Sequence, residues 1–251
     1  MTTTKNLNDT IVACATPAGY SSIGVVRISG SQAISFTKRI FYSKPIEDHI
    51  ENHRAYYGDI IQPDTREVID KAVAVFHLAP HSYTGEDVVE ISCHGNPLII
   101  ERVVRLFTEL GARVAERGEF TKRALLNGKI DLLQAESVLD TVYSPCDEAR
   151  KLAIAQYEGK LSKKVYELKS KIIDLLVLVE ADIDFGEEEE FTEDRTSINN
   201  TLEAVIQEID LLLDGAELGM KIKEGYKVLI IGRANVGKST LFNRLVGYDR
   251  A

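Results

Sequence analysis

The sequence predicts an α+β fold at its N-terminal end, an all-α region in its middle and the start of an α/β domain at its C-terminal end. Three observations predict this order. Up to about residue 119, short β-like segments and helix-like segments are separated by turn residues. From Gly118 onward, the apolar residues recur with helical spacing. Near the C-terminal end, an apolar segment runs directly into a glycine-rich loop.

The first region is expected to hold five strands and two helices. The predicted helix Pro97–Gly111 is the clearer of the two, because it has proline in its first turn and ends at a glycine. The strands are expected at 10–16, 23–29, 53–61, 70–78 and 87–94, and the helices at Gln32–Ile40 and Pro97–Gly111.

The middle region is expected to be helical throughout. Helices are predicted over Phe120–Leu126, over Asp131–Tyr143 with Asp131 as N-cap, from Cys146 to Phe185 as one long helix, and from Arg195 to Leu218. Residues 219–225 are then expected to be a linker. The long helix carries a narrow coiled-coil-like seam, which predicts lengthwise packing on other helices. The seam residues are Tyr157, Leu161, Val165, Leu168, Ile172, Leu175 and Val179.

The glycine-rich loop has the pattern of a phosphate-binding loop. Gly232 is followed after four residues by Gly237, Lys238 and Ser239. The apolar segment 226–231 is expected to be a buried parallel strand, and the segment after the loop a helix that stops at Gly247. In such a loop, backbone amides and the helix N-terminus bind phosphate, the lysine reaches the β- and γ-phosphates, and the serine hydroxyl ligates Mg²⁺.

The sequence after this loop is short. Only 24 residues run from Val228 to Ala251, whereas a domain usually needs ~100–200 residues. The further strands, the metal-binding carboxylate and the base-reading loop of a nucleotide-binding domain are not in the sequence. We therefore expect a truncated chain whose last piece is poorly ordered or forms one strand and one helix. No catalytic residue is predicted.

Composition indicates an ordinary globular protein. The chain has 251 residues, of which 44% are hydrophobic and 27% charged, and a net charge of −9, which disfavours a surface that binds nucleic acid all over. No apolar run is long enough for a membrane span, and the N-terminus lacks the pattern of a signal peptide. The three cysteines are far apart and odd in number, which favours free thiols and a cytoplasmic protein.

Three charged residues have two interpretations each. Arg27 and Glu90 interrupt apolar strand segments, and Lys129 lies in a turn between two predicted helices. All three could simply face solvent. Alternatively, Arg27 and Glu90 face a pocket, where arginine suits a carboxylate or carbonyl and glutamate suits the paired N–H donors of a pterin or guanine ring. The local pattern does not decide between these interpretations.

Two other features are less suggestive of chemistry. Cys93 and His94 are neighbours on a predicted strand, so their side chains point to opposite faces and do not form a nucleophile–base pair. The four glutamates 187–190 are expected to form a solvated acidic loop and not a metal site.

The order of these parts resembles the MnmE (TrmE) family of tRNA-modification GTPases. The resemblance is carried by "DTIVACATPAG", "SYTGEDVVEISCHG", "RGEFTKRALLNGKIDLLQAES", "EADIDF" and "GRANVGKSTLFN", which occur in this order. It implies an α+β folate-binding and dimerisation domain over 1–119, the first part of an all-α helical domain over 120–220, and the start of an α/β P-loop GTPase domain over 221–251.

The resemblance also implies ligands, partners and site residues. Arg27, Glu90 and Lys129 match positions that contact a tetrahydrofolate such as 5-formyl- or methylene-tetrahydrofolate. Asn235 matches a ligand of K⁺, and Ser239 a ligand of Mg²⁺. The implied GTP contacts are Asn235, Val236, Gly237, Lys238, Ser239 and Thr240. The family works as a homodimer with the flavoprotein MnmG. Together they add an aminomethyl-type, for instance carboxymethylaminomethyl, group to carbon 5 of the wobble uridine of certain tRNAs, with folate as the one-carbon donor.

The sequence departs from the family pattern in two loops and at its end. "AGYSS" replaces a more glycine-rich loop, "HGN" stands where "HGG" is common, and the family's C-terminal Cys-x-Gly-Lys motif is not in the sequence. We therefore expect negligible GTP hydrolysis by this chain. Two alternatives are a folate-binding dimer module without activity and a P-loop GTPase of the ribosome-assembly type, although the 220 residues before the loop disfavour the second.

Overall fold

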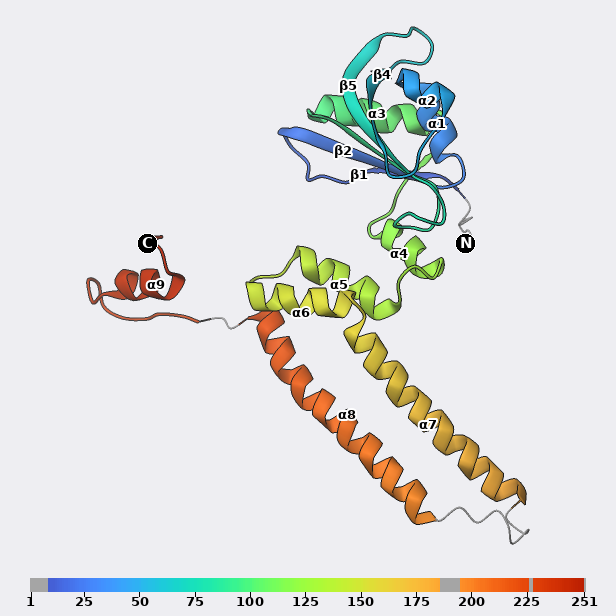
Figure 1. Ribbon diagram of the computed structural model, residues 1–251. Coiled ribbons are helices and arrows are strands. Elements are labelled where there is room, and N and C mark those ends of the chain that lie inside the picture. The colour runs from blue at the N-terminus through green and yellow to red at the C-terminus, as the bar shows by residue number, and fades with distance from the viewer. Residues whose placement is uncertain (1–8, 186–194, 226–227, 251) are drawn as a thin grey trace, which may run out of the picture. The chain divides into compact units, whose positions relative to one another are not determined.

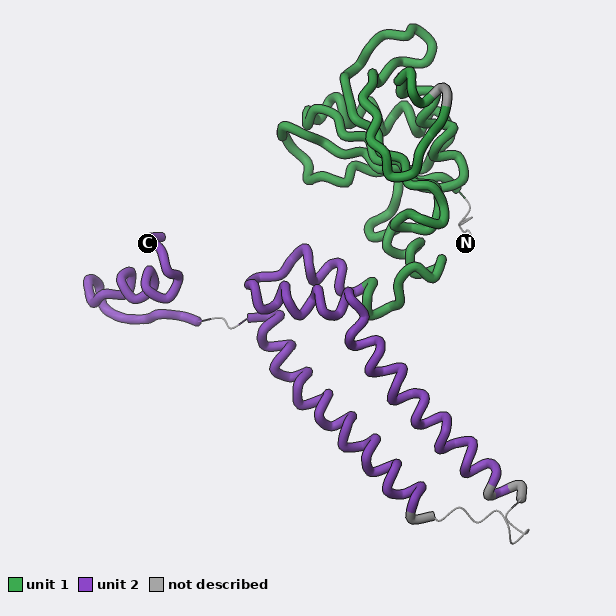
Figure 2. Tube along the Cα trace, viewed as in Figure 1, with its two compact units in different colours: residues 1–135 green, residues 136–251 purple. Residues whose placement is uncertain are grey.

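The computed structural model describes residues 9–185, 195–225 and 228–250. It divides into an N-terminal unit, Met1–Ala135, and a C-terminal unit, Glu136–Ala251 (Figure 2). The N-terminal unit is built around a seven-stranded sheet, and long helices dominate the C-terminal unit (Figure 1). The α+β fold followed by a helical region is therefore confirmed.

The sheet is antiparallel except at one edge. Its strand order is β3-β4-β5-β6-β2-β1-β7, and only β1 and β7 pair in parallel. All five expected strands are present, while β3 and β7 are too short for their sequences to show a period. The strands are β1 (Ile11–Cys14), β2 (Ser21–Ser29), β3 (Phe41–Tyr42), β4 (Ala55–Ile61), β5 (Val68–His77), β6 (Val88–Gly95) and β7 (Arg113–Val114).

One face of the sheet is covered by helices α1 (Ala33–Ile40) and α3 (Pro97–Glu109), both as expected. Alternate strand residues such as Val26, Ile28, Val89 and Ile91 are fully buried against Phe107 and its neighbours on these helices. The short helix α2 (Lys44–Asp48), which follows Ser43 and has proline in its first turn, was not expected from the sequence. This face is the hydrophobic core of the N-terminal unit.

The other face of the sheet, called the open face here, carries the remaining alternate residues. They are mostly half-buried and include charged, polar and small apolar side chains: Val25, Arg27, Val73, Val75, His77, Glu90 and Ser92. The loop 78–87 between β5 and β6 contacts one end of this face, where Ser29 and Thr84 are fully buried and their hydroxyls lie 2.8 Å apart.

The region after the sheet is helical as expected, but it holds one helix more than expected and some boundaries differ. Helix α4 (Glu119–Leu126) and helix α5 (Leu132–Val142) form as expected, and Asp131 caps α5 by accepting from the Gln134 amide at 2.9 Å. The expected single helix 146–185 is wrong. Gly159, with φ of 80°, separates α6 (Asp147–Tyr157) from α7 (Lys160–Phe185).

Helices α7 and α8 (Arg195–Glu224) pack on each other, and α6 contacts both. The expected linker at 219–225 is wrong, because α8 continues through it and stops at Gly225, where φ is 72°. Of the seam residues, Leu168 and Leu175 are buried, while the others that flank them on α7 are more than a third exposed. Glu208 on α8 joins the two helices by ion pairs with Lys164 and Lys171.

The last described segment contains the glycine-rich loop and helix α9 (Lys238–Val246), which ends at Gly247 as expected. The expected buried strand is wrong for residues 228–231. They form no strand, and Val228, Leu229 and Ile231 are each more than three-quarters exposed, since no strand among the described residues pairs with them. Residues 226 and 227 and the acidic run 187–190 lie outside the described residues. None of the described helices is long and apolar enough to cross a membrane.

Candidate functional site

Arg27 and Glu90 form an ion pair on the open face. They are directly opposite each other on the adjacent antiparallel strands β2 and β6. Nε and Nη2 of Arg27 both lie 2.7 Å from Oε1 of Glu90, and each side chain is about 30% exposed. The pair is therefore neither fully solvated nor part of the buried core. Both interpretations of these residues, the solvent-facing one and the pocket, are compatible with this position.

Two aromatic rings flank the Arg27 guanidinium. Its Cζ atom lies 5.5 Å from the ring centroid of Phe120 and 5.9 Å from that of Tyr83. The Tyr83 hydroxyl is in turn 2.8 Å from the Thr121 hydroxyl. Arginine attracts the negative face of aromatic rings, so the rings hold the guanidinium in place while leaving part of it exposed. Charge pair and rings together make a surface suited to a flat ligand with both donors and acceptors.

A group of five charged residues, called the ion network here, fixes the two elements that carry these rings. Arg123 on α4 is only 1% exposed and lies at its centre, paired with Asp9, with Glu86 at 3.2 Å and with Glu119 at 3.3 Å. Arg113 pairs with Asp9 at 2.6 Å and with Glu119 at 2.5 Å. Glu86 belongs to the loop of Tyr83, and Arg123 to the helix of Phe120. The network therefore ties both rings to the sheet.

The pKa values in the ion network move toward the charged forms. Hydrogen bonds from Arg113 lower the pKa of Glu119 to about 2, against the opposing effect of burial. For Asp9, burial alone would raise the pKa, but hydrogen bonds from Arg113 and Arg123 lower it overall. Asp9 and Glu119 are thus charged at neutral pH, as are Arg113 and Arg123, whose pKa values are raised. Sequence reasoning missed this network; the spacing of four residues between Glu119 and Arg123, at which helix side chains meet, is a signal that could have indicated part of it.

Lys129 follows α4 and contacts the same loop as Tyr83. Its Nζ donates to the Pro80 carbonyl at 3.0 Å, and its aliphatic part lies against Gly85. Gly85 has φ of 80°, a backbone conformation that favours glycine. Within the described part of the chain, no hydrogen bond joins Lys129 to Arg27 or Glu90. The loop 78–87 is what connects Lys129 with the pair.

Cys93 and His94 point to opposite sides, as expected. Cys93 is 3% exposed in the core, and burial raises the pKa of its thiol to about 11, which leaves it unreactive. His94 is exposed, and its Nδ1 lies 2.7 Å from Asp70 Oδ1, while Asp70 Oδ2 accepts from the His94 amide at 2.8 Å. The structure thus excludes a Cys93–His94 pair.

The phosphate-binding loop takes its shape from contacts among its own residues. Asn235 has φ of 59° and Gly237, the N-cap of α9, has φ of 88°. Lys238 folds back on the loop, where its Nζ donates to the carbonyls of Gly232 at 3.0 Å and Arg233 at 2.5 Å. Ser239 and Thr240 line a hollow of about 620 Å³ beside α9. Such an arrangement can bind phosphate at the helix N-terminus.

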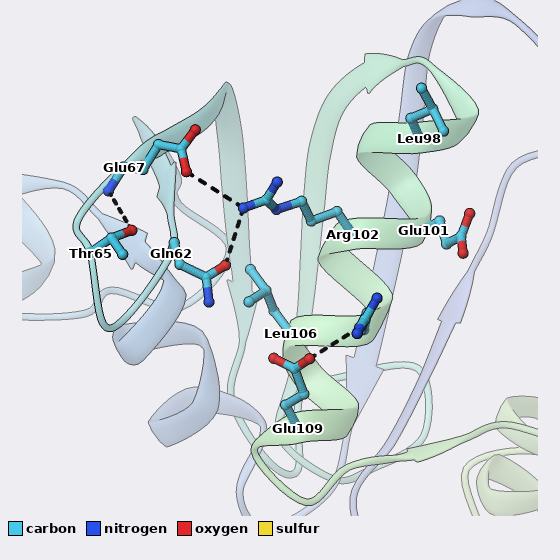
Figure 3. Close-up of a pocket in the computed structure, with 9 residues that line it drawn as sticks. Gln62, Thr65, Glu67, Leu98, Glu101, Arg102, Leu106 and Glu109 are labelled. Carbon is cyan, nitrogen blue, oxygen red and sulfur yellow. Dashed lines mark hydrogen bonds and ion pairs between the residues drawn. The ribbon is translucent and has the colours of Figure 1, made fainter.

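Another hollow, of about 630 Å³, lies between α3 and the turn that joins β4 to β5 (Figure 3). Arg102 crosses it to contact Gln62 at 3.5 Å and Glu67 at 3.6 Å. Arg105 on the same helix pairs with Glu109. None of the site residues expected from the sequence lines this hollow, so we assign it no role in the site.

Two family models match the chain in succession. The model of the GTP-binding protein TrmE N-terminus matches residues 10–129, and the model of the MnmE helical domain matches residues 132–249. The first covers the sheet, the Arg27–Glu90 pair and every residue of the ion network except Asp9.

Similar proteins carry the same name. A tRNA modification GTPase MnmE of Aquifex aeolicus is 45% identical over 98% of this chain and 54% of its own length. The proteins of that name from Desulforamulus reducens and Staphylococcus aureus (strain Newman) are 43% and 41% identical over 98% and 97% of this chain, and over 54% and 53% of their own lengths. The chain thus spans about half the length of these relatives. With two matching domain models in the right order and relatives this similar along nearly all of its length, the chain belongs to the MnmE (TrmE) family.

Proposed function

We propose that this chain supplies the folate-binding, helical and phosphate-binding parts of a cytoplasmic GTPase that modifies tRNA. The proposed parts are 1–119, 120–220 and 221–251. The observation that carries the folate assignment is the half-exposed Arg27–Glu90 pair between the rings of Tyr83 and Phe120. Membership of the MnmE family supports the tRNA and GTP assignments. It also sets aside the alternative of a ribosome-assembly GTPase.

In the proposed folate site, each residue has a distinct task. Glu90 accepts from the paired N–H groups of the pterin ring through the oxygen that Arg27 does not use. Arg27 donates to a carbonyl or carboxylate of the ligand through the part of its guanidinium that is not bound to Glu90. Tyr83 and Phe120 offer apolar surface to the flat ring. Lys129 is free to leave the Pro80 carbonyl and pair with a ligand carboxylate.

In the proposed GTP site, the loop residues Asn235 to Thr240 hold the phosphates with their backbone amides. Lys238 exchanges its two loop carbonyls for the β- and γ-phosphates, and Ser239 ligates Mg²⁺ together with phosphate oxygens. Asn235, whose positive φ sets it apart in the loop, contributes to a K⁺ site next to the phosphates. The cation supplies the positive charge that an arginine supplies in other GTPases.

The whole protein is proposed to act as a homodimer with MnmG. Together they add the carboxymethylaminomethyl-type group to carbon 5 of the wobble uridine, with the one-carbon unit drawn from tetrahydrofolate. GTP hydrolysis drives the conformational cycle of that reaction. For this chain itself, we propose folate binding.

Calorimetric titration of 5-formyl-tetrahydrofolate into the chain tests the folate assignment. We expect binding by the parent and a loss of about 2 kcal/mol or more in Arg27→Ala and in Glu90→Ala, since each leaves a charged partner unpaired. Arg105→Ala is the matched control, because Arg105 also pairs with a carboxylate and lines the hollow of Figure 3. A loss confined to Arg105→Ala would move the ligand to that hollow and contradict the proposal.

A further inference from the structure

Two histidines are hydrogen-bonded to each other beside the Arg27–Glu90 pair. Nδ1 of His77, at the end of β5, lies 3.0 Å from Nδ1 of His53, and the rings meet edge to face with centroids 5.0 Å apart. Both atoms are ring nitrogens, so one must carry a hydrogen and the other must accept it. When both rings are neutral, the contact therefore requires them to be in opposite tautomers.

His77 lies on the open face next to Glu90. The register places His77 opposite Val88 and Glu90 opposite Val75, so His77 and Glu90 are diagonal neighbours on adjacent strands. Diagonal neighbours are about 7–8 Å apart, within reach of long side chains. Burial lowers the pKa of His77, Glu90 opposes this, and His53 and Arg27 lower it further. These three charged or titratable groups face His77, which is neutral at neutral pH.

His53 is exposed to solvent but firmly placed. Its φ is 60°, a region that residues other than glycine seldom adopt, although histidine does so more often than most. Its amide donates to the Phe76 carbonyl at 2.8 Å, and the neighbouring Asn52 side chain accepts from the Leu78 amide at 2.9 Å. The segment is thus clamped to the backbone on both sides of His77.

We propose that His53 and His77 form a proton relay between solvent and the Arg27–Glu90 pair. In the starting state, His53 is protonated at Nδ1 and His77 at Nε2. His53 takes a proton from water at Nε2 and passes its Nδ1 proton to Nδ1 of His77. His77 then releases its Nε2 proton to a base on the open face, either the Glu90 carboxylate or a nitrogen of a bound ligand. One proton leaves solvent, one reaches the base, and both rings end neutral with exchanged tautomers.

The relay fits the chemistry of a site that handles a tetrahydrofolate, because the ring nitrogens of such a ligand gain and lose protons when a one-carbon unit is transferred. This last step rests on the proposed function. The histidine pair itself does not, so the two can be tested separately.

The first test uses nitrogen-15 NMR of the imidazoles in the full chain. We expect opposite tautomers for His53 and His77, and an upward shift of the His77 midpoint in His53→Gln, since one group that lowers its pKa is gone. His49→Gln, an exposed histidine before the same clamped segment, is the control and should leave His77 unchanged. Two rings of the same tautomer, or independent titrations, would overturn the relay.

The second test follows the association rate of 5-formyl-tetrahydrofolate from about pH 5 to 8, the range in which histidines titrate. A relay changes how fast a proton reaches the site and not the equilibrium affinity, so the rate is the quantity to measure. The parent rate should change with pH. His77→Gln and His53→Gln should flatten this dependence, and His49→Gln should not. A pH dependence of the rate that survives in His77→Gln would overturn the relay. No binding at any pH, with the NMR result as expected, would overturn the folate assignment and keep the relay.

Discussion

The open face of the N-terminal sheet and the phosphate-binding loop of the C-terminal unit both carry residues that the sequence singled out, yet they are supported differently. Arg27 and Glu90 lie on central strands of a seven-stranded sheet whose other face is a packed core. The loop around Lys238 is followed by one short helix without buried residues. A short motif such as the phosphate-binding loop can therefore take its local shape without a hydrophobic core, whereas a cross-strand pair such as Arg27–Glu90 depends on the core that holds its strands together.

The difference follows from where each site finds its hydrogen bonds. The loop forms hydrogen bonds within its own sequence, since Lys238 donates to the carbonyls five and six residues before it. Arg27 and Glu90 are 63 residues apart in sequence, and only the register of β2 and β6 brings them together. If the two regions differ in this way, substitutions around the sheet should lower the free energy of unfolding far more than substitutions in the loop or in α9.

Removing a core side chain should separate the two regions most clearly. Phe107→Ala empties a fully buried position under the sheet and should lower the free energy of unfolding of the N-terminal unit by about 3–5 kcal/mol. Leu245→Ala on α9 removes a side chain that is 69% exposed and should cost less than about 0.5 kcal/mol. Urea unfolding with hydrogen exchange of the β6 amides measures both. Equal effects would contradict the comparison.

Removing the centre of the ion network should be nearly as costly. Arg123→Met keeps most of the volume but leaves Asp9, Glu86 and Glu119 without their shared partner, and breaking a buried pair in this way costs about 3–5 kcal/mol. Arg105→Met, whose pair with Glu109 is exposed, should stay within about 1 kcal/mol of the parent. The same unfolding assay applies. A parent-like Arg123→Met would show that the network does not hold α4 and its loop in place.

Acid should weaken the N-terminal unit through Glu119. Hydrogen bonds from Arg113 lower its pKa from 4.5 to about 2, so its stabilising contribution is complete above about pH 4.5 and is lost as the pH falls toward 2. The full effect is on the order of 3 kcal/mol. Unfolding free energies measured across this range should fall less steeply in Glu119→Gln, while Glu109→Gln on the exposed side of α3 keeps the parent slope.

The smallest effect is expected at the phosphate-binding loop. Lys238→Ala removes two hydrogen bonds to exposed carbonyls and should change the stability of either unit by less than about 0.5 kcal/mol, while abolishing any binding of a fluorescent GTP analogue. Hydrogen exchange and fluorescence titration measure the two quantities. A large loss of stability would mean that the loop has structural support beyond its own residues.

Sequence reasoning succeeded where a local pattern carries the information. The strands of 53–61 and 70–78, the helix that begins at Pro97 and the cap at Asp131 all follow from periodicity and from cap or turn residues. It failed where distant segments decide. Nothing in the neighbourhood of Asp9 indicates that it meets Arg113 and Arg123 more than 100 residues later. Residues 228–231 have the composition of a buried strand, but a strand needs a neighbour to pair with.

The residues of the proposed folate site illustrate the same limit. Arg27 and Glu90 could be identified as unusual, but their pairing depends on the register of β2 against β6, which cannot be read from the sequence. Tyr83, Phe120 and His77 were not singled out at all, because an aromatic residue in a loop or in the first turn of a helix, or a histidine at a strand end, has no distinctive local pattern.

The ion network also determines how far this protein can be shortened. The last strand of the sheet ends at Val114, and a scheme based on strands alone would cut there and begin at Ile11. Such a piece would keep Arg113 and Glu86 but lose Asp9, Glu119 and Arg123. Arg113 and Glu86 would then lie without their ion-pair partners in the network. The smallest autonomous piece must instead run from before Asp9 to beyond the end of α4, so its limits are set by electrostatics and not by the outline of the sheet.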